Sequence, residues 1–251
     1  MHNSKYLLYI DILGFSNLVK EDSPKIERLF TIIDNLNMHK HFDFQTIVFS
    51  DTILCFNSGV PTTHDEYLVM YACEFVQNLL YRSADLGIQF RAILTYGEFF
   101  YEKLSHIEKY YGKALVEAHD KEKEINGIGL FIHKDILKYN TNFETVCFDK
   151  DLHFVYLMQC MESLLPYAHE IPLRNSVVQD VIDPSHIKLE VRVLETVKKN
   201  IDDTQLDSKI RGKYSLTYLL YQQRYGELID VLEKNHFECN IISPDVDWES
   251  F

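Results

Sequence analysis

The chain has 251 residues, 46% of them hydrophobic, and its 38 acidic and 25 basic residues give a formal net charge of −13. A surface this acidic repels nucleic acid and anionic membranes, whereas it can hold cations. The five cysteines include no CxxC pair, so we expect no zinc or disulfide framework. No apolar run reaches the roughly 18 residues of a membrane span, and no apolar segment follows a basic N-terminus. We therefore expect a cytoplasmic protein with no bound nucleic acid and no stable membrane association.

The first segments alternate strand and helix patterns. Residues 6–13 (YLLYIDIL) form a continuous apolar run that is typical of a strand buried on both faces, and Gly14 ends it. Ser16 or Asn17 can cap a short helix after the glycine. Apolar residues at helical spacing then predict a second helix over residues 23–37, with a Ser-Pro start.

The next segments continue the alternation. Residues 42–56 predict two strands joined by a tight turn at Ser50 and Asp51. A long helix over residues 61–87 ends at a glycine, and residues 88–101 predict another strand. The remaining expected elements are a helix at 113–125, a strand at 127–133, a short helix at 133–140, strands at 143–149 and 151–157, and helices at 187–201 and 208–235.

This order of elements predicts an α+β fold. Strands and helices alternate in the way that gives a mostly antiparallel sheet of the ferredoxin-like type, flanked by helices. The pattern changes after roughly residue 160, where helical periods take over. We therefore expect one domain over residues 1–160 and a helical extension over residues 161–251, packed on that domain or on a partner.

Two aspartates stand out against their apolar surroundings. Asp11 lies inside the first apolar strand, where burying a lone carboxylate is costly, and Asp51 lies at the turn between the next two strands. In a ferredoxin-like sheet these strands can be neighbours, so the two carboxylates would repel unless a cation lay between them. The pattern thus suggests a site for Mg²⁺ or Mn²⁺ with a triphosphate. The plainer interpretation of the same residues is that Asp11 caps the following helix and Asp51 is an ordinary turn residue.

Two segments carry a resemblance to a known family. YIDILGFS and FSDTI resemble the metal-binding segments of class III nucleotide cyclases, which convert a nucleoside triphosphate to a 3′,5′-cyclic monophosphate and pyrophosphate. More closely, the chain resembles the Pycsar-type pyrimidine cyclases of bacterial anti-phage defence, which make cyclic UMP or cyclic CMP. That resemblance rests on DILGFSNLV, FSDTI, FRAILTYGE, YYGKALVEAHDKEKE and KYSLTYLLYQQ, and extends over nearly the whole chain.

The resemblance implies a class III cyclase core with a metal-dependent site. Asp11 and Asp51 would hold two ions of Mg²⁺ or Mn²⁺, with the Ile12 carbonyl as a further ligand. The terminal phosphates would be bound by the backbone of Gly14, Phe15 and Ser16. The family acts as a head-to-tail homodimer in which both chains build each site.

The chain departs from the purine cyclases at three positions. Those enzymes usually show G-x-x-V-N-x-A-x-R, but here the asparagine is Val116 and the arginine is Asp120. They also carry a charged base-reading residue about four positions before the hairpin aspartate, which is Ile47 here. The departures argue against adenine and guanine and do not separate uracil from cytosine.

Cationic residues are candidates for phosphate contact. Arg91 lies between apolar residues of a strand, and it contacts either a phosphate in catalysis or an acid such as Glu98 or Glu117 in a structural pair, the second being slightly favoured. Lys113 and Lys109 flank a helix start and can bind phosphate there, although surface lysine is the commoner role.

The base has its own candidates. Phe42 and Phe44 share one face of a strand, so either ring can stack on a nucleobase, although packing in the core is the better expectation for each one singly. Two functions remain: a pyrimidine nucleotide cyclase, favoured because both aspartates are present, and a catalytically silent relative that binds a nucleotide or only dimerises.

Overall fold

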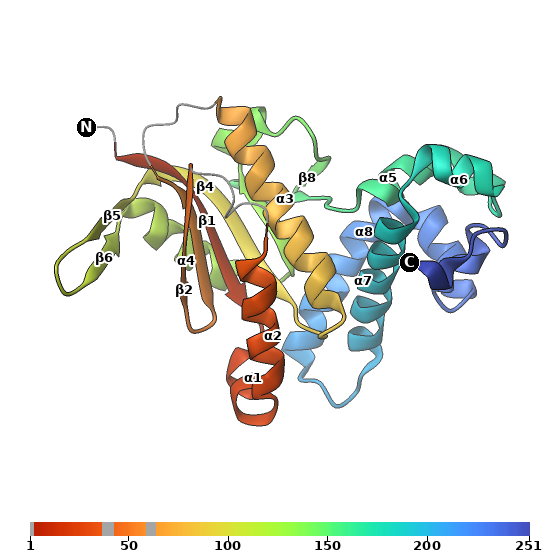
Figure 1. Cartoon of the computed structure of the whole chain (residues 1–251), viewed down its shortest axis with the longest axis horizontal. Helices are drawn as coiled ribbons and strands as arrows, with labels where there is room; N and C mark the ends of the chain where they lie inside the picture. The colour runs from red at the N-terminus through yellow and green to blue at the C-terminus, as the bar shows by residue number, and fades with distance from the viewer. Residues whose placement is uncertain (1–2, 37–42, 59–63) are drawn as a thin grey trace. The chain divides into compact units, whose positions relative to one another are not determined.

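The structure is a computed structural model, and it divides into two compact units, residues 1–157 and residues 158–251 (Figure 1). It describes residues 3–36, 43–58 and 64–251. The sequence predicts a change from mixed strand and helix patterns to helical patterns near residue 160, close to this junction.

Within the described residues, the N-terminal unit contains a seven-stranded sheet in the order β2-β3-β1-β4-β7-β9-β8. Neighbouring strands are antiparallel except for β4 and β7, which run parallel. The central strand β1 is the continuous apolar run, and its middle residues are buried, as the sequence predicts. The strands are β1 (Ser4–Ile12), β2 (Phe44–Phe49), β3 (Thr52–Asn57), β4 (Phe90–Glu98), β7 (Gly129–His133), β8 (Thr145–Cys147) and β9 (Leu152–Val155).

The first half of this unit follows the ferredoxin-like path. Two helices lead from β1 to the β2–β3 hairpin, and a long helix leads from β3 to β4 on the other side of β1. The antiparallel order 2-3-1-4 is the order of that fold, so the predicted α+β class with a mostly antiparallel sheet is confirmed. The helices are α1 (Phe15–Glu21), α2 (Ser23–Asp34), α3 (Asp65–Ala84), α4 (Lys113–Glu124) and the 3-10 helix Lys134–Tyr139.

Helices lie on both faces of the sheet. On one face the Phe44 ring lies 6.2 Å from the ring of Tyr71 in α3. On the other face the His119 ring of α4 lies 6.1 Å from the ring of Tyr9 in β1. Because side chains alternate along a strand, Asp11 shares the α4 face with Tyr9.

A second, two-stranded sheet differs from the prediction. The sequence predicts one strand over residues 88–101, but β4 ends at Glu98 and a separate hairpin follows it (Figure 1). Charged cross-strand pairs stabilise this hairpin, among them Lys109 and Glu102 at 2.7 Å. Its turn contains neither glycine nor proline, so it gives little signal in the sequence. The strands are β5 (Phe100–Lys103) and β6 (Glu108–Tyr111).

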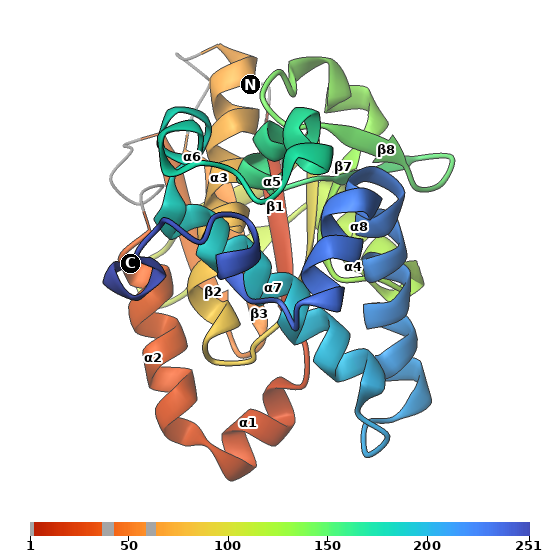
Figure 2. The same ribbon diagram turned by 90° about the vertical axis from the view of Figure 1, so that its right-hand side faces the viewer.

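The C-terminal unit is helical, as expected. Its α5 begins at Gln159, and the buried Glu190 of α7 accepts hydrogen bonds of 3.0 and 2.7 Å from the amides of Cys160 and Met161 in that first turn. Its helices are α5 (Gln159–Leu164), α6 (Asn175–Val181), α7 (Pro184–Asp202), α8 (Ser208–Lys234) and the 3-10 helices Leu165–Glu170, Cys239–Ile241 and Trp248–Ser250. Figure 2 shows α7 and α8 side by side. Among the described helices, none combines the length and apolar character needed to cross a membrane.

Candidate functional site

The two aspartates singled out by the sequence lie at the same end of the sheet. The register of β1 and β3 sets Asp11 opposite Thr52, and Asp51 is the residue just before β3. The Ile12 amide donates a hydrogen bond of 2.9 Å to the Asp51 carbonyl, which joins the end of β1 to the turn. Ser50 completes the turn in the left-handed region, with φ 56. The topology thus brings together two carboxylates that are far apart in the sequence.

Arg91 of β4 lies on the other side of Asp11. Its Nη2 is 3.6 Å from Asp11 Oδ2 and forms an ion pair with Glu122 of α4. Its Nη1 donates hydrogen bonds of 2.8 and 2.6 Å to two main-chain carbonyls at the C-terminal end of α4. The guanidinium is therefore held in a buried structural pair, as one of the two interpretations expects, but with Glu122 as its acid instead of Glu98 or Glu117.

The electrostatics of the site are set by an excess of carboxylates. The pKa of Asp11 is raised from 3.8 to about 6, first by burial and then by the charge of Glu122. Arg91 lowers this pKa, and the charge of Asp51 raises it further. Two carboxylates, Asp11 and Glu122, thus contact one guanidinium, and Asp51 adds a third negative charge near Asp11, so an added cation would relieve their repulsion.

The oxygen atoms at this end of the sheet fit a hard cation. The Leu13 amide donates a hydrogen bond of 2.9 Å to the Gln89 carbonyl, on the β4 side, whereas the Ile12 amide donates to the Asp51 carbonyl, on the hairpin side. The amide and the carbonyl of one residue point to the same side of an antiparallel strand, so the Ile12 carbonyl also faces the hairpin and not β4. Two carboxylates and one carbonyl are ligands that Mg²⁺ and Mn²⁺ accept while keeping positions for water and phosphates. In the described part of the chain, no three His, Cys, Asp or Glu residues are grouped to hold a metal ion, so the carbonyl and a bound substrate would have to complete the shell.

The turn after β1 offers free backbone donors. Gly14 precedes α1 with φ 71, a conformation that favours glycine, and its carbonyl accepts from Asn17 and Leu18. The amides of Phe15 and Ser16 have no partner within the helix, because the first amides of a helix never do. They lie directly after the strand that carries Asp11.

The predicted lysines lie away from this end of the sheet. Lys113 starts α4 beside Gly97, whose Cβ position is 3.2 Å from Ala114, whereas Glu122 near the other end of α4 contacts Arg91. These two ends of α4 are about 13 Å apart along the helix axis. Within one protomer, Lys113 is therefore not brought to the aspartates.

The other lysine and the aromatic candidates also lie elsewhere. Lys109 is paired with Glu102 in the β5–β6 hairpin. Phe44 is buried against α3 on the face opposite Asp11, so the structure gives it a place in the core and does not bring it to the site. Phe42 lies outside the described residues. Ile47 does share the Asp11 face, through its register with Leu54.

The two positions at which the resemblance expects an asparagine and an arginine are exposed. Val116 is 60% exposed on α4, and the Asp120 side chain is exposed one turn later. No residue that could replace the asparagine and arginine stands at these positions.

Glu122 is the residue that sequence reasoning missed. Its signal was its place in α4, because Ala114, Ala118 and Glu122 recur every four residues and are the buried residues of this helix. An acid on a buried helical stripe needs a basic partner, and Arg91 was the buried base available.

Comparisons with known proteins find similarity to solved structures at low sequence identity. No family model matches the sequence, and no curated protein matches it. A bacterial light-regulated adenylyl cyclase is similar at 12% identity and a TM-score of 0.47, over 62% of this chain and 92% of that one. The adenylyl cyclase CyaB of P. aeruginosa is similar at 10% identity and a TM-score of 0.45, over 62% and 95% of the two chains. The guanylyl cyclase domain of a RhoGC fusion protein from the fungus Blastocladiella emersonii is similar at 14% identity and a TM-score of 0.45, over 61% and 94%.

Proposed function

We propose that this protein is a divalent-metal-dependent nucleotide cyclase that converts a nucleoside triphosphate to a 3′,5′-cyclic monophosphate and pyrophosphate. The observation that carries the proposal is the meeting of Asp11 and Asp51 beside the Ile12 carbonyl and the turn at Gly14. A carboxylate pair followed directly by free backbone amides suits a substrate that is both metal-bound and rich in phosphate.

Each residue has a distinct part in the proposed reaction. Asp11, Asp51 and the Ile12 carbonyl hold the cations, and the amides of Phe15 and Ser16 receive the terminal phosphates. Bound Mg²⁺ or Mn²⁺ would lower the pKa of the ribose 3′-hydroxyl and offset the phosphate charge. Arg91 fixes the Asp11 carboxylate and limits the negative charge around it, a positioning role that fits its buried pair with Glu122.

A second copy of the chain is part of the proposal. Lys113 lies at the end of α4 away from its own aspartates, so a phosphate contact by Lys113 would require the site of a partner in a head-to-tail homodimer. The resemblance to the cyclase family supports that arrangement.

The substrate base is proposed to be a pyrimidine, uracil or cytosine. Ile47 lies on the same sheet face as Asp11, and its aliphatic side chain has no hydrogen bond to offer a purine edge. The resemblance to the Pycsar-type cyclases supports cyclic UMP or cyclic CMP as product, and with it a second-messenger role in anti-phage defence in the cytoplasm.

The alternative is a cyclase-like protein that binds a nucleotide without turnover. The observation in its favour is that Val116 and Asp120 stand where purine cyclases have the residues that stabilise the reacting phosphate. The two functions differ in one readout, because only the cyclase forms pyrophosphate.

The proposal is tested by incubating the purified protein with Mn²⁺ and ATP, GTP, CTP or UTP, and by measuring products with mass spectrometry. We expect a cyclic monophosphate from UTP or CTP that is lost in Asp11→Asn and in Asp51→Asn. Asp135→Asn, an exposed carboxylate on the 3-10 helix, is the matched control and should keep full activity. Nucleotide binding without product in the wild type would favour the silent alternative.

A further inference from the structure

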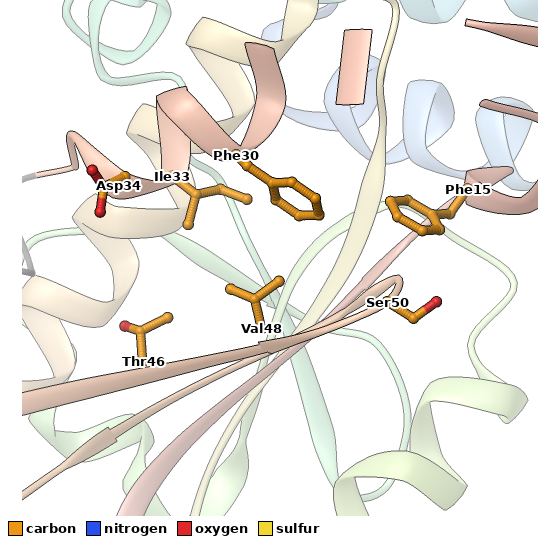
Figure 3. A pocket seen from close by; sticks show the side chains of 7 residues that line it. All are labelled: Phe15, Phe30, Ile33, Asp34, Thr46, Val48 and Ser50. Atoms are coloured by element: carbon orange, nitrogen blue, oxygen red, sulfur yellow. The ribbon is translucent and has the colours of Figure 1, made fainter. Parts of the chain in front are cut away.

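A cavity of about 680 Å³ lies between α2 and the outer strand β2, on the sheet face opposite Asp11. Ligand pockets typically enclose about 300–1,000 Å³, so it is large enough for a small organic molecule. Asp11 lies on the other face, and the proposed nucleotide site shares with the cavity only Phe15, of which it uses the backbone amide. Its lining residues are Phe15, Phe30, Ile33, Asp34, Thr46, Val48 and Ser50 (Figure 3).

The middle of the cavity is apolar. Phe30 and Ile33 of α2 point toward Val48 of β2 in Figure 3. Val48 is 40% exposed although it is aliphatic, and the rings of Phe30 and Phe15 are 6.3 Å apart. A hydrophobic body placed here would remove this surface from water, which is favourable in proportion to the area covered.

One end of the cavity is negatively charged. Asp34 is the last residue of α2, where the helix dipole already gives a partial negative charge, and the last turn of α2 contains no basic residue. No described residue forms an ion pair or a hydrogen bond with the Asp34 carboxylate. An acid at a helix C-terminus is unfavourable by itself, so a cationic group beside it would be stabilised twice, by the carboxylate and by the dipole.

We propose that this cavity binds a small organic amine. Its ammonium group would meet Asp34, and its apolar body would lie against Phe30, Ile33 and Val48. The net charge of −13 favours a cationic ligand over a neutral or anionic one by raising its local concentration.

The other end of the cavity adjoins the proposed catalytic residues. Phe15 directly follows Gly14, and Ser50 directly precedes Asp51. A bound amine would contact both segments that flank the aspartates and would change the turnover of the enzyme. The change in turnover rests on the proposed cyclase function, whereas binding of the amine in the cavity does not.

The test compares phenethylamine with 2-phenylethanol, which has the same ring and a neutral end. Binding is measured by calorimetry and by amide chemical shifts at neutral pH, without metal or nucleotide. We expect saturable binding of phenethylamine, about three- to fivefold tighter than the alcohol, because Asp34 is exposed and an ion pair with an exposed carboxylate is weak. Amide shifts should change in α2 and β2.

Three variants sharpen the test. Asp34→Asn should weaken the binding of phenethylamine about three- to fivefold and leave that of the alcohol unchanged. Val48→Trp places an indole in the apolar middle of the cavity and should weaken the binding of both probes, and Asp135→Asn should change neither. Equal affinity for amine and alcohol would overturn the amine class. Absence of binding, or shifts confined to residues outside α1, α2, β2 and the turn at Ser50, would overturn the site, and both results stand whether or not the protein proves to be a cyclase.

Discussion

The carboxylate of Asp11 has three charged neighbours that act on its proton affinity in different directions. Glu122 and Asp51 raise its pKa, Arg91 lowers it, and burial raises it most. The result, a pKa of about 6, means that the folded protein binds this proton more tightly than the unfolded chain does. Ionised Asp11 therefore reduces stability above about pH 6, and this cost disappears as the pH falls toward the unfolded value near 4.

Asp11→Asn should therefore stabilise the metal-free protein at about pH 8, by roughly 2 kcal/mol, and should give little gain at about pH 4. Urea unfolding at the two pH values measures the difference. Adding Mn²⁺ should reverse the ranking, because an ion that binds only the folded wild type stabilises it. A variant as unstable as the wild type at pH 8 would mean that Asp11 bears no such cost.

The buried ion pair of Arg91 and Glu122 should contribute to the stability of the fold. Arg91→Met leaves the buried acids Glu122 and Asp11 without their cation, so we expect a loss of about 3–5 kcal/mol in the free energy of unfolding. The double variant Arg91→Met with Glu122→Met removes both charges and should recover most of that loss. Equal losses in the single and the double variant would show that the ion pair is not the cause.

Single residues also show what the sequence can and cannot predict. Asp11 was found because a carboxylate is anomalous in an apolar strand. The sequence did not predict the face of the sheet on which Phe44 lies. That face depends on the register of β1, β2 and β3, because a shift of one residue would put Phe44 on the same face as Asp11.

At the scale of elements, the start of α4 depends on a close backbone approach. Gly112 has φ 153, and a Cβ there would lie 2.2 Å from the Glu98 carbonyl oxygen at the end of β4. No side chain fits without moving the backbone of one element. This contact sets where α4 begins, and so where Glu122 lies relative to Arg91.

Gly112→Ala should consequently destabilise the protein by at least about 2 kcal/mol. Gly226→Ala is the matched control, because Gly226 follows the kink at Tyr225 in α8 with nothing within 4 Å of its Cβ position, and it should change the stability by less than about 1 kcal/mol. Thermal unfolding of both variants measures the contrast. A harmless Gly112→Ala would mean that the two backbones separate easily.

For the whole molecule, the sequence predicted the fold class because its strand and helix periods agree with the ferredoxin-like order. It did not predict the β5–β6 hairpin, whose charged cross-strand pairs form only once the chain has reversed. Nor does the order of elements reveal which residues a second copy contributes, since one chain's topology contains only one chain's neighbours.

Mixing two inactive variants tests which residues a second copy contributes to the site. If Lys113 serves the partner's site, Asp11→Asn and Lys113→Ala are each inactive alone, but mixed dimers contain one intact site. An equal mixture should then recover about a quarter of the wild-type activity, because half of the dimers are mixed and each has one of two sites. Full activity of Lys113→Ala alone would return it to the role of a surface lysine.

The direct opposition of Asp11 and Arg91 across β1 and β4 also limits how such a gene can change over evolutionary time. Inserting or deleting a single codon between Tyr6 and Asp11 would turn the aspartate to the α3 side of the sheet, away from Arg91 and Glu122. Between Tyr6 and Asp11 the sequence can therefore change by substitution, whereas insertions and deletions would disrupt the site. The β5–β6 turn, whose residues face no such register, can lengthen freely without disturbing the aspartates.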